Sequence, residues 1–187
     1  MEFTNQQKLI ITMLSDIHAK LDIEDSSVDP DFVRRAVCED QGWALSWKYP
    51  GLFDESGEDP DMVKYVADVL EMWSTLEDSF KALDAKERDE LAAAADPFGK
   101  DVKFPGFDGN NEYKLLAIAR IFVKDLERWS ELGRIDNSHC QTTDGYRRML
   151  AVFDKIRSDK SQNHDFTLFT VEEIAQVLNG RRHPSRA

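Results

Sequence analysis

The chain has 187 residues, of which 41% are apolar and 32% are charged, and this composition is typical of a folded domain rather than a disordered chain. Two cysteines are too few for a disulfide scaffold, and no apolar run approaches membrane-spanning length. The polar N-terminus predicts no secretory signal, so we expect a cytoplasmic protein.

The formal net charge of −12 argues against a general nucleic-acid binder, because such affinity depends mainly on neutralising phosphates. The negative charge lies in the first part of the chain. Residues 1–100 contain 10 Lys and Arg against 23 Asp and Glu, whereas residues 101–187 contain 14 against 13. The second part therefore tolerates a local basic patch.

Helix signals begin at the N-terminus. Thr4 and Gln7 have the spacing of a capping box. Apolar residues follow it at helical spacing: Leu9, Ile10, Met13, Leu14, Ile17 and Leu21. Asp29 before Pro30 predicts a second helix start, and Gly42 is expected to end that helix.

The longest helix is predicted to start after a loop at residues 48–58, at Asp59-Pro60. Its apolar residues alternate at spacings of four and three for about three heptads. They are Met62, Val66, Val69, Trp73, Leu76, Phe80 and Leu83. Since Trp and Phe are bulky for a two-stranded coil, we expect a central helix packed on several neighbours. A capping box at Asp84 and Glu87 predicts a surface helix after it.

The stretch KFPGFDGNNE, residues 103–112, has the polar groups and glycines of a catalytic loop, but each has a structural use. Asp108 is placed to cap a helix, and Glu112 to lie in its first turn. We therefore interpret the stretch as a cap and turn. The helix is predicted to end at Gly133, and its apolar residues are Leu115, Leu116, Ala119, Phe122, Val123, Leu126 and Trp129.

Two further helices complete the chain. The first has an inward series of Tyr146, Met149, Leu150, Phe153 and Ile156. The second starts at a capping box formed by Thr170 and Glu173, and Gly180 ends it.

The sum is an all-α fold: an irregular bundle of six to seven helices with no significant sheet. We expect an N-terminal helical region at residues 1–58 and a C-terminal bundle at 59–187, or one compact unit.

Several stretches resemble the bacterial YfbU family in order and spacing. They are FTNQQKLI, VLEMWSTLEDSF, FPGFDGNNE followed by ARIFVKDLERW, YRRMLAVFDKI and FTVEEIAQVLNG. The resemblance covers most of residues 59–180 and the first helix, and is weaker over 22–58 and 84–101. It implies an all-helical, oligomeric protein of uncharacterised function, part of which has been likened to a helix-turn-helix. It implies no catalytic residues.

The loop at residues 134–145 contains the side-chain types of a nucleophilic site: Arg134, Asp136, Asn137, His139, Cys140 and Asp144. Neighbours in sequence rarely point at one another as a nucleophile and its base must, so we favour a polar interhelical loop. His18 with Asp22 and the acidic residues 54–61 lack the further ligands that a metal needs. We therefore expect no catalytic site, no metal and no cofactor.

A basic cluster in the last part of the chain supplies candidates for phosphate or nucleic-acid contacts: Arg147, Arg148, Lys155, Arg157, Arg181 and Arg182. On a helix, the first four spread around much of the circumference, which dilutes the patch. Solvated helix faces are the favoured interpretation.

The leading functional hypothesis is a cytoplasmic helical interaction or regulatory protein that forms a homo-oligomer and is not an enzyme. Its four Trp and eleven Phe residues are enough to fill both a core and an interface. The alternative is a nucleic-acid-associated regulator that uses the basic C-terminal half. An enzyme acting through His139 receives little weight.

Overall fold

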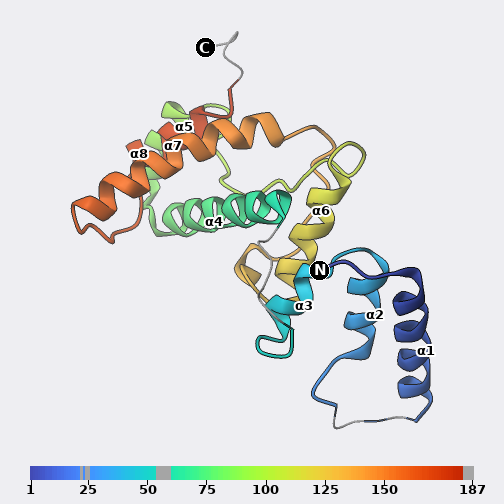
Figure 1. The fold of residues 1–187 in the computed structure, drawn as a ribbon. Coiled ribbons are helices and arrows are strands. Elements are labelled where there is room, and N and C mark those ends of the chain that lie inside the picture. Colours follow the sequence, from blue (N-terminus) through green and yellow to red (C-terminus); the bar gives the residue numbers. More distant parts are fainter. Residues whose placement is uncertain (22, 24–25, 54–59, 183–187) are drawn as a thin grey trace. The chain divides into compact units, whose positions relative to one another are not determined.

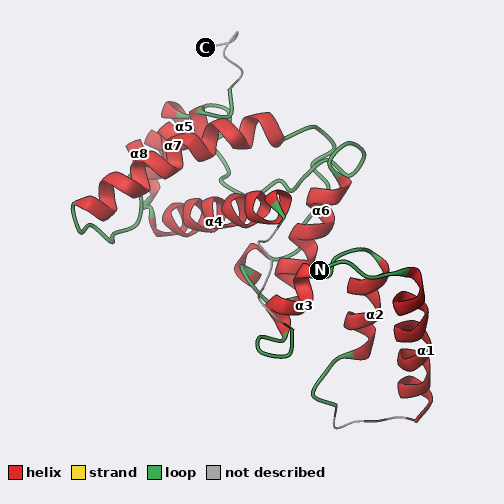
Figure 2. Ribbon diagram, viewed as in Figure 1, coloured by secondary structure: helices red, strands yellow, loops and turns green. Residues whose placement is uncertain are grey.

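The structure, a computed structural model, describes residues 1–21, 23, 26–53 and 60–182, and over these residues it is all-α (Figures 1 and 2). Its regular structure there consists of eight α-helices, a π-helical turn and a 3-10 turn. The β pairing within the described residues consists of two isolated bridges, Pro50–Phe53 and Phe107–Asn137. The predicted fold class is confirmed, with more helices than expected. No helix in the described ranges is long and apolar enough to cross a membrane.

The chain divides into two compact units, Met1–Asp61 and Met62–Ala187. The first unit contains α1 (Asn5–Leu21), α2 (Pro30–Cys38) and α3 (Trp43–Lys48). The second contains α4 (Asp61–Ala82), which begins at the boundary, α5 (Ala85–Ala94), α6 (Tyr113–Arg120), α7 (Thr143–Gln162) and α8 (Val171–Asn179). The π-helical turn Ile121–Asp125 and the 3-10 turn Ser130–Leu132 lie between α6 and α7.

The helix starts in the first unit follow the sequence signals. The Thr4 N–H donates to Gln7 Oε1 (2.9 Å) and the Gln7 N–H donates to Thr4 Oγ1 (3.3 Å), which confirms the capping box of α1. Asp29 Oδ1 accepts the first free amides of α2, each at 3.0 Å.

The predicted end of the second helix at Gly42 was wrong. Helix α2 ends at Cys38, and Gly42 directly precedes the short helix α3, which the sequence patterns did not predict. A Cβ at Gly42 would lie 2.5 Å from the Met1 carbonyl oxygen, so this position needs glycine for a close backbone approach.

Helix α4 forms the centre of the second unit. Four members of its predicted seam are buried, and so are residues on its other sides, including Leu70 and Met72. The Trp73 ring lies 5.9 Å from the rings of both Phe104 and Tyr146, so α4 and α7 share one aromatic cluster. The expected central helix with several neighbours is therefore present.

The stretch 103–112 is a turn, as predicted, and is held by contacts to three other segments. The Phe104 N–H donates to the buried Glu77 carboxylate (2.9 Å), and the Tyr146 hydroxyl donates to the Gly106 carbonyl (2.8 Å). Gly106 has φ +87°, and a Cβ there would collide with the Asp136 carbonyl. The predicted helix cap at Asp108 was wrong, because its carboxylate accepts from Asn110 and Asn111 within the turn, and α6 starts later.

Glu112 is the N-cap residue of α6, where its backbone carbonyl accepts the Leu116 N–H (3.0 Å), but its side chain caps α7. Its Oε1 accepts the Thr142 N–H (2.9 Å), the Thr143 N–H (2.8 Å) and the Thr143 hydroxyl (2.6 Å). Its Oε2 accepts the Thr142 hydroxyl and the Asp108 N–H, both at 2.9 Å. This buried carboxylate therefore satisfies free amides at the N-terminus of a 20-residue helix, where the helix dipole also favours an anion.

The predicted helix ending at Gly133 was wrong in its second half. The α-helical pattern stops at Arg120, and the Leu126 N–H then donates to the Ile121 carbonyl in a π-helical bond (3.0 Å). Trp129 adopts φ +51°, and its indole N–H donates to Glu71 on α4 (2.9 Å). A tertiary contact thus overrides the local helical periodicity.

The other cap predictions are confirmed. Asp84 with Glu87 and Thr170 with Glu173 form complete capping boxes at α5 and α8. Helix α5 buries only Leu91 among its described residues, as expected for a surface helix.

We expect Glu112→Gln to lower the free energy of unfolding by about 2 kcal/mol at neutral pH. The NH2 group of glutamine would face N–H and O–H donors and cannot accept their hydrogen bonds as the carboxylate oxygen does. Chemical denaturation followed by circular dichroism measures this. Glu90→Gln is the matched control, because Glu90 forms only an exposed pair with Lys86 and should change stability by less than about 0.5 kcal/mol.

The effect of Glu112→Gln should depend on pH. Burial raises the pKa of Glu112, but the hydrogen bonds from Thr143, Asp108 and Thr142 outweigh it and hold the pKa below its ordinary value. A carboxyl with a lowered folded pKa contributes its full stability above the unfolded pKa of about 4.3 and loses it as the pH falls further. A difference between wild type and variant that is unchanged well below pH 4 would contradict this assignment.

Candidate functional site

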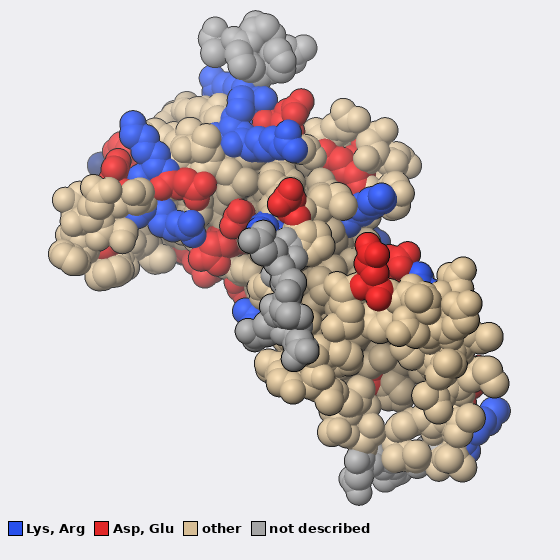
Figure 3. All heavy atoms as spheres, viewed as in Figure 1, with Lys and Arg blue, Asp and Glu red and all other residues tan. Residues whose placement is uncertain are grey.

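The largest uncovered apolar surface of the described residues lies on α1. Six large side chains of this helix are between 51% and 65% exposed: Leu9, Ile10, Met13, Leu14, Ile17 and Leu21. These are the same residues that the sequence identifies as one apolar series. The space-filling view in Figure 3 shows a largely uncharged surface over α1 and α2.

The opposite, more polar side of α1 packs on α2. Ser15 is the buried residue of α1, and its hydroxyl contacts the carbonyls of Ile11 (2.9 Å) and Pro30 (3.2 Å). Lys8 Nζ lies 2.6 Å from the Asp40 carboxylate beyond the end of α2. Because these contacts fix the rotation of α1, its apolar side points away from α2.

The spacing of the exposed residues suits pairing with another helix. Ile10, Leu14, Ile17 and Leu21 follow the four-three-four spacing of a coiled-coil seam. Six side chains of this size, about half exposed, present roughly 600 Å² on one chain, and two such faces reach the roughly 1,200 Å² at which stable interfaces begin. A patch of this size on an isolated chain marks an interaction surface.

The loop at 134–145 has structural contacts. Asn137 Oδ1 accepts the Gly109 N–H (2.9 Å) and the His139 N–H (2.8 Å), and the Ser138 hydroxyl donates to the Cys140 carbonyl (2.7 Å). The His139 and Cys140 side chains are exposed. The loop therefore supports the 103–112 turn.

Metal ligation has no geometric support in the part of the chain that the structure describes, where no three His, Cys, Asp or Glu side chains form a ligand group. The candidate pair His18 and Asp22 cannot be tested as a pair, because Asp22 lies outside the described residues. The same holds for most of the acidic stretch 54–61.

The structure brings together three of the six basic candidates. Arg148 donates to the carbonyls of Gly180 and Arg181, both at 3.0 Å, which places Arg181 and Arg182 near the start of α7. Arg182 also donates to the Asp96 carbonyl.

The other three basic candidates lie on α7, apart from this group. Arg147 lies over the Tyr65 ring, and Arg157 pairs with Asp154 (3.4 Å). Lys155 is exposed. On the face shown in Figure 3, Lys and Arg side chains gather in one patch near the C-terminal end of the chain and elsewhere lie among acidic side chains.

A cavity of about 570 Å³ lies beside the start of α7. Its lining combines the cationic Arg148 and Arg181 with the anionic Glu112 and Asp144. Arg181 stacks over Phe98 with its guanidinium carbon 4.9 Å from the ring centre. The cavity is therefore of mixed charge. The Glu112 carboxylate already accepts the hydrogen bonds of the Thr142 and Thr143 amides at the start of α7.

Comparisons with known proteins place the chain in a family. The profile of the YfbU domain matches residues 1–180. The UPF0304 protein MJECS11 of Methanocaldococcus jannaschii is 26% identical over 134 residues, which cover 68% of this chain and 71% of that protein. No solved structure matches the chain. Because the domain profile spans nearly the whole sequence, the chain belongs to the YfbU family.

Proposed function

We propose that this chain is a cytoplasmic interaction or regulatory protein that works as a homo-oligomer and has no catalytic role. The observation that carries the proposal is the apolar face of α1, defined by the six exposed residues from Leu9 to Leu21. A second copy is the partner that needs no further assumption, because it offers the same seam and the same area.

The chemistry of α1 supports self-association. The contacts of Ser15 and Lys8 set its orientation without using the apolar side, so pairing requires no rearrangement of α1 against α2. Preformed surfaces of this kind associate at low entropic cost. The four seam residues carry no charge, and the exposed Lys20 lies at the edge of the face, where its ammonium can stay in water when two copies meet.

A second candidate, a nucleic-acid-associated regulator, draws on the convergence of Arg148, Arg181 and Arg182 beside a cavity. Of these, Arg148 and Arg182 donate to backbone carbonyls, which leaves fewer of their N–H groups to contact phosphates. The net charge of −12 also opposes this candidate, which therefore ranks second.

We expect wild-type protein to sediment as an oligomer at micromolar concentration and the double variant Leu14→Gln, Ile17→Gln to sediment as a monomer. Because a two-fold interface contains each residue once per protomer, the double variant removes four apolar side chains from it. The dissociation constant should therefore rise at least about 100-fold. Circular dichroism should show unchanged helix content, because both residues are exposed in the single chain.

The matched control for this experiment is Leu52→Gln, which changes an equally exposed leucine of the same unit outside α1 and should leave the oligomer intact. A strictly monomeric wild type, or an oligomer that is insensitive to the α1 variant, would refute the proposed interface.

The second candidate predicts that the protein raises the fluorescence anisotropy of mixed-sequence duplex DNA or RNA at low salt, with a steep loss at physiological salt. Arg181→Glu with Arg182→Glu should then weaken binding and flatten the salt slope. Lys20→Glu with Arg34→Glu, both in the other unit, makes the same change in net charge and is the control. Absence of binding even at low salt removes this candidate.

A further inference from the structure

A second surface lies on the segment between α7 and α8, residues 163–170. From Asp165 to Phe169 this segment has no helical structure, and residues with contacts to the protein alternate with residues that have none among the described contacts. Asp165, Thr167 and Phe169 make contacts with the protein, whereas Phe166 and Leu168 are 85% and 52% exposed.

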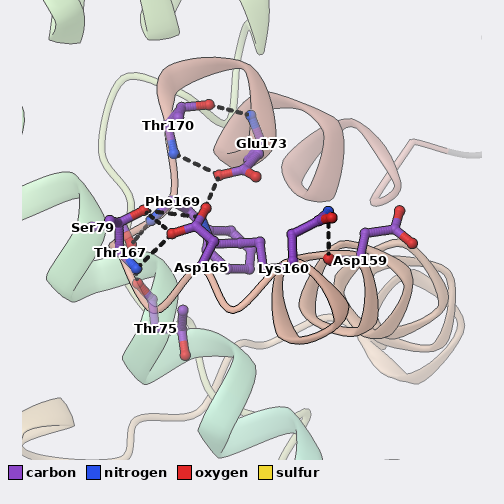
Figure 4. Close-up of polar contacts among 10 residues, drawn as sticks. Thr75, Ser79, Asp159, Lys160, Asp165, Thr167, Phe169, Thr170 and Glu173 are labelled. Atoms are coloured by element: carbon purple, nitrogen blue, oxygen red, sulfur yellow. Dashed lines mark hydrogen bonds and ion pairs between the residues drawn. The ribbon is translucent and has the colours of Figure 1, made fainter.

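The Asp165 carboxylate fixes the first half of the segment (Figure 4). It accepts from Lys160 Nζ (2.6 Å), from the Thr167 N–H (2.9 Å) and from the Thr167 hydroxyl (2.7 Å). The Lys160 hydrogen bond, with those of Thr167, holds the pKa of this carboxyl well below its usual range. Above the ordinary aspartate pKa of about 3.9, Asp165 is therefore ionised and keeps its contacts with Lys160 and Thr167. We call this set of contacts the tether.

Lys160 ties this tether to α8. Its side chain is only 11% exposed, and Nζ also lies 3.7 Å from Glu173 Oε2 in the capping box of α8. Figure 4 shows Lys160 between Asp165 and Glu173. One ammonium group thus joins the end of α7, the connecting segment and the start of α8.

Phe169 fixes the other end of the segment. Its N–H donates to Ser79 Oγ on α4 (3.0 Å), and its ring lies 5.6 Å from the buried ring of Phe153. Phe166 and Leu168 therefore alternate with fixed residues. Single exposed apolar residues are common, but a pair held by such contacts is preorganised for binding.

A cavity of about 300 Å³ adjoins Leu168. Leu168 lines it together with Leu83 and Val171. Its charged lining residues are all acidic: Glu87, Glu90 and Glu172. Glu87 also caps α5 and Glu90 forms an exposed pair with Lys86, so Glu172 adds the charge that these contacts do not use. The site therefore offers two exposed apolar side chains beside a small recess whose lining is more polar than apolar and carries acidic residues.

We propose that Phe166, Leu168 and the adjacent cavity form a docking site for a short segment of another protein, one that carries an apolar side chain beside Lys or Arg. The apolar side chain packs on Phe166 and Leu168, and the cations enter the cavity toward its glutamates. Phe166 and Leu168 expose only roughly 250 Å², far below what a stable dimer needs, so the occupant is a peptide-length segment and not a second copy. The acidic lining disfavours nucleic acid.

The test is selection of random dodecapeptides displayed on phage against the immobilised full chain. We expect selected peptides to combine an aromatic residue or leucine with Lys or Arg, and to bind with a dissociation constant on the order of 10 µM. Their addition should shift the amide NMR signals of residues 165–172 and 83–90.

Variants locate the contacts. Phe166→Ser with Leu168→Ser should weaken binding at least about tenfold, whereas Leu52→Ser, an exposed leucine in the other unit, should not change it. Glu90→Gln with Glu172→Gln should weaken binding and reduce its dependence on salt.

The role of the tether has its own variant. Asp165→Asn keeps Phe166 and Leu168 but removes the charge that Lys160 and Thr167 contact, so we expect weaker binding with an unchanged selected motif. Asp159→Asn, an exposed aspartate at the same end of α7, is the matched control.

The proposal is overturned by failure to enrich any peptide, by selected peptides without basic residues, or by binding that survives the Phe166 and Leu168 substitutions. Loss of peptide binding in the Leu14→Gln, Ile17→Gln variant would assign the peptides to α1 instead. A change in sedimentation caused by the Phe166 and Leu168 substitutions would make the surface a self-interface, which also contradicts the proposal.

Discussion

The second unit depends on one buried carboxylate. Glu112 accepts five hydrogen bonds and joins the turn at 103–112 to the start of α7, thirty residues later. A buried charge is tolerated only when it is fully hydrogen-bonded, so the turn, the cap and the helix must form together. Tyr146, one turn into α7, then closes the arrangement by contacting Gly106 and Trp73. The aromatic cluster that packs α4 on α7 is aligned by this polar contact.

Local signals in the sequence predicted the parts of the fold that are decided locally. The caps at Asp29, Asp84 and Thr170 need only neighbours within three residues, and they formed as expected. The role of Glu112 could not be predicted, because its partners are distant in sequence and its own position looked like an ordinary first turn. The π-helical turn after Arg120 likewise follows from a contact to another helix, which periodicity does not contain.

The α1 surface was visible in the sequence as an apolar series, but its exposure was not. An apolar face normally turns toward the core, and a helical pattern does not state which side is covered. In this chain the side with Ser15 faces α2, where a small hydroxyl allows close approach and contacts the Pro30 carbonyl. The segment around Phe166 was missed for a different reason. It covers only five residues between two helices, too few for a periodic signal.

The two surfaces have different physical properties, and together they define how such a protein would work. The α1 seam is broad and uncharged, which favours stable association of identical chains, whereas the Phe166 site is small and adjoins acidic residues, which favours brief contacts with a basic segment. A homo-oligomer formed through α1 carries the second site once in each protomer. If a partner has several basic segments, linked contacts raise its apparent affinity well above that of one site. Weak docking by a single chain would then become effective only in the assembled state, so that self-association itself controls partner binding.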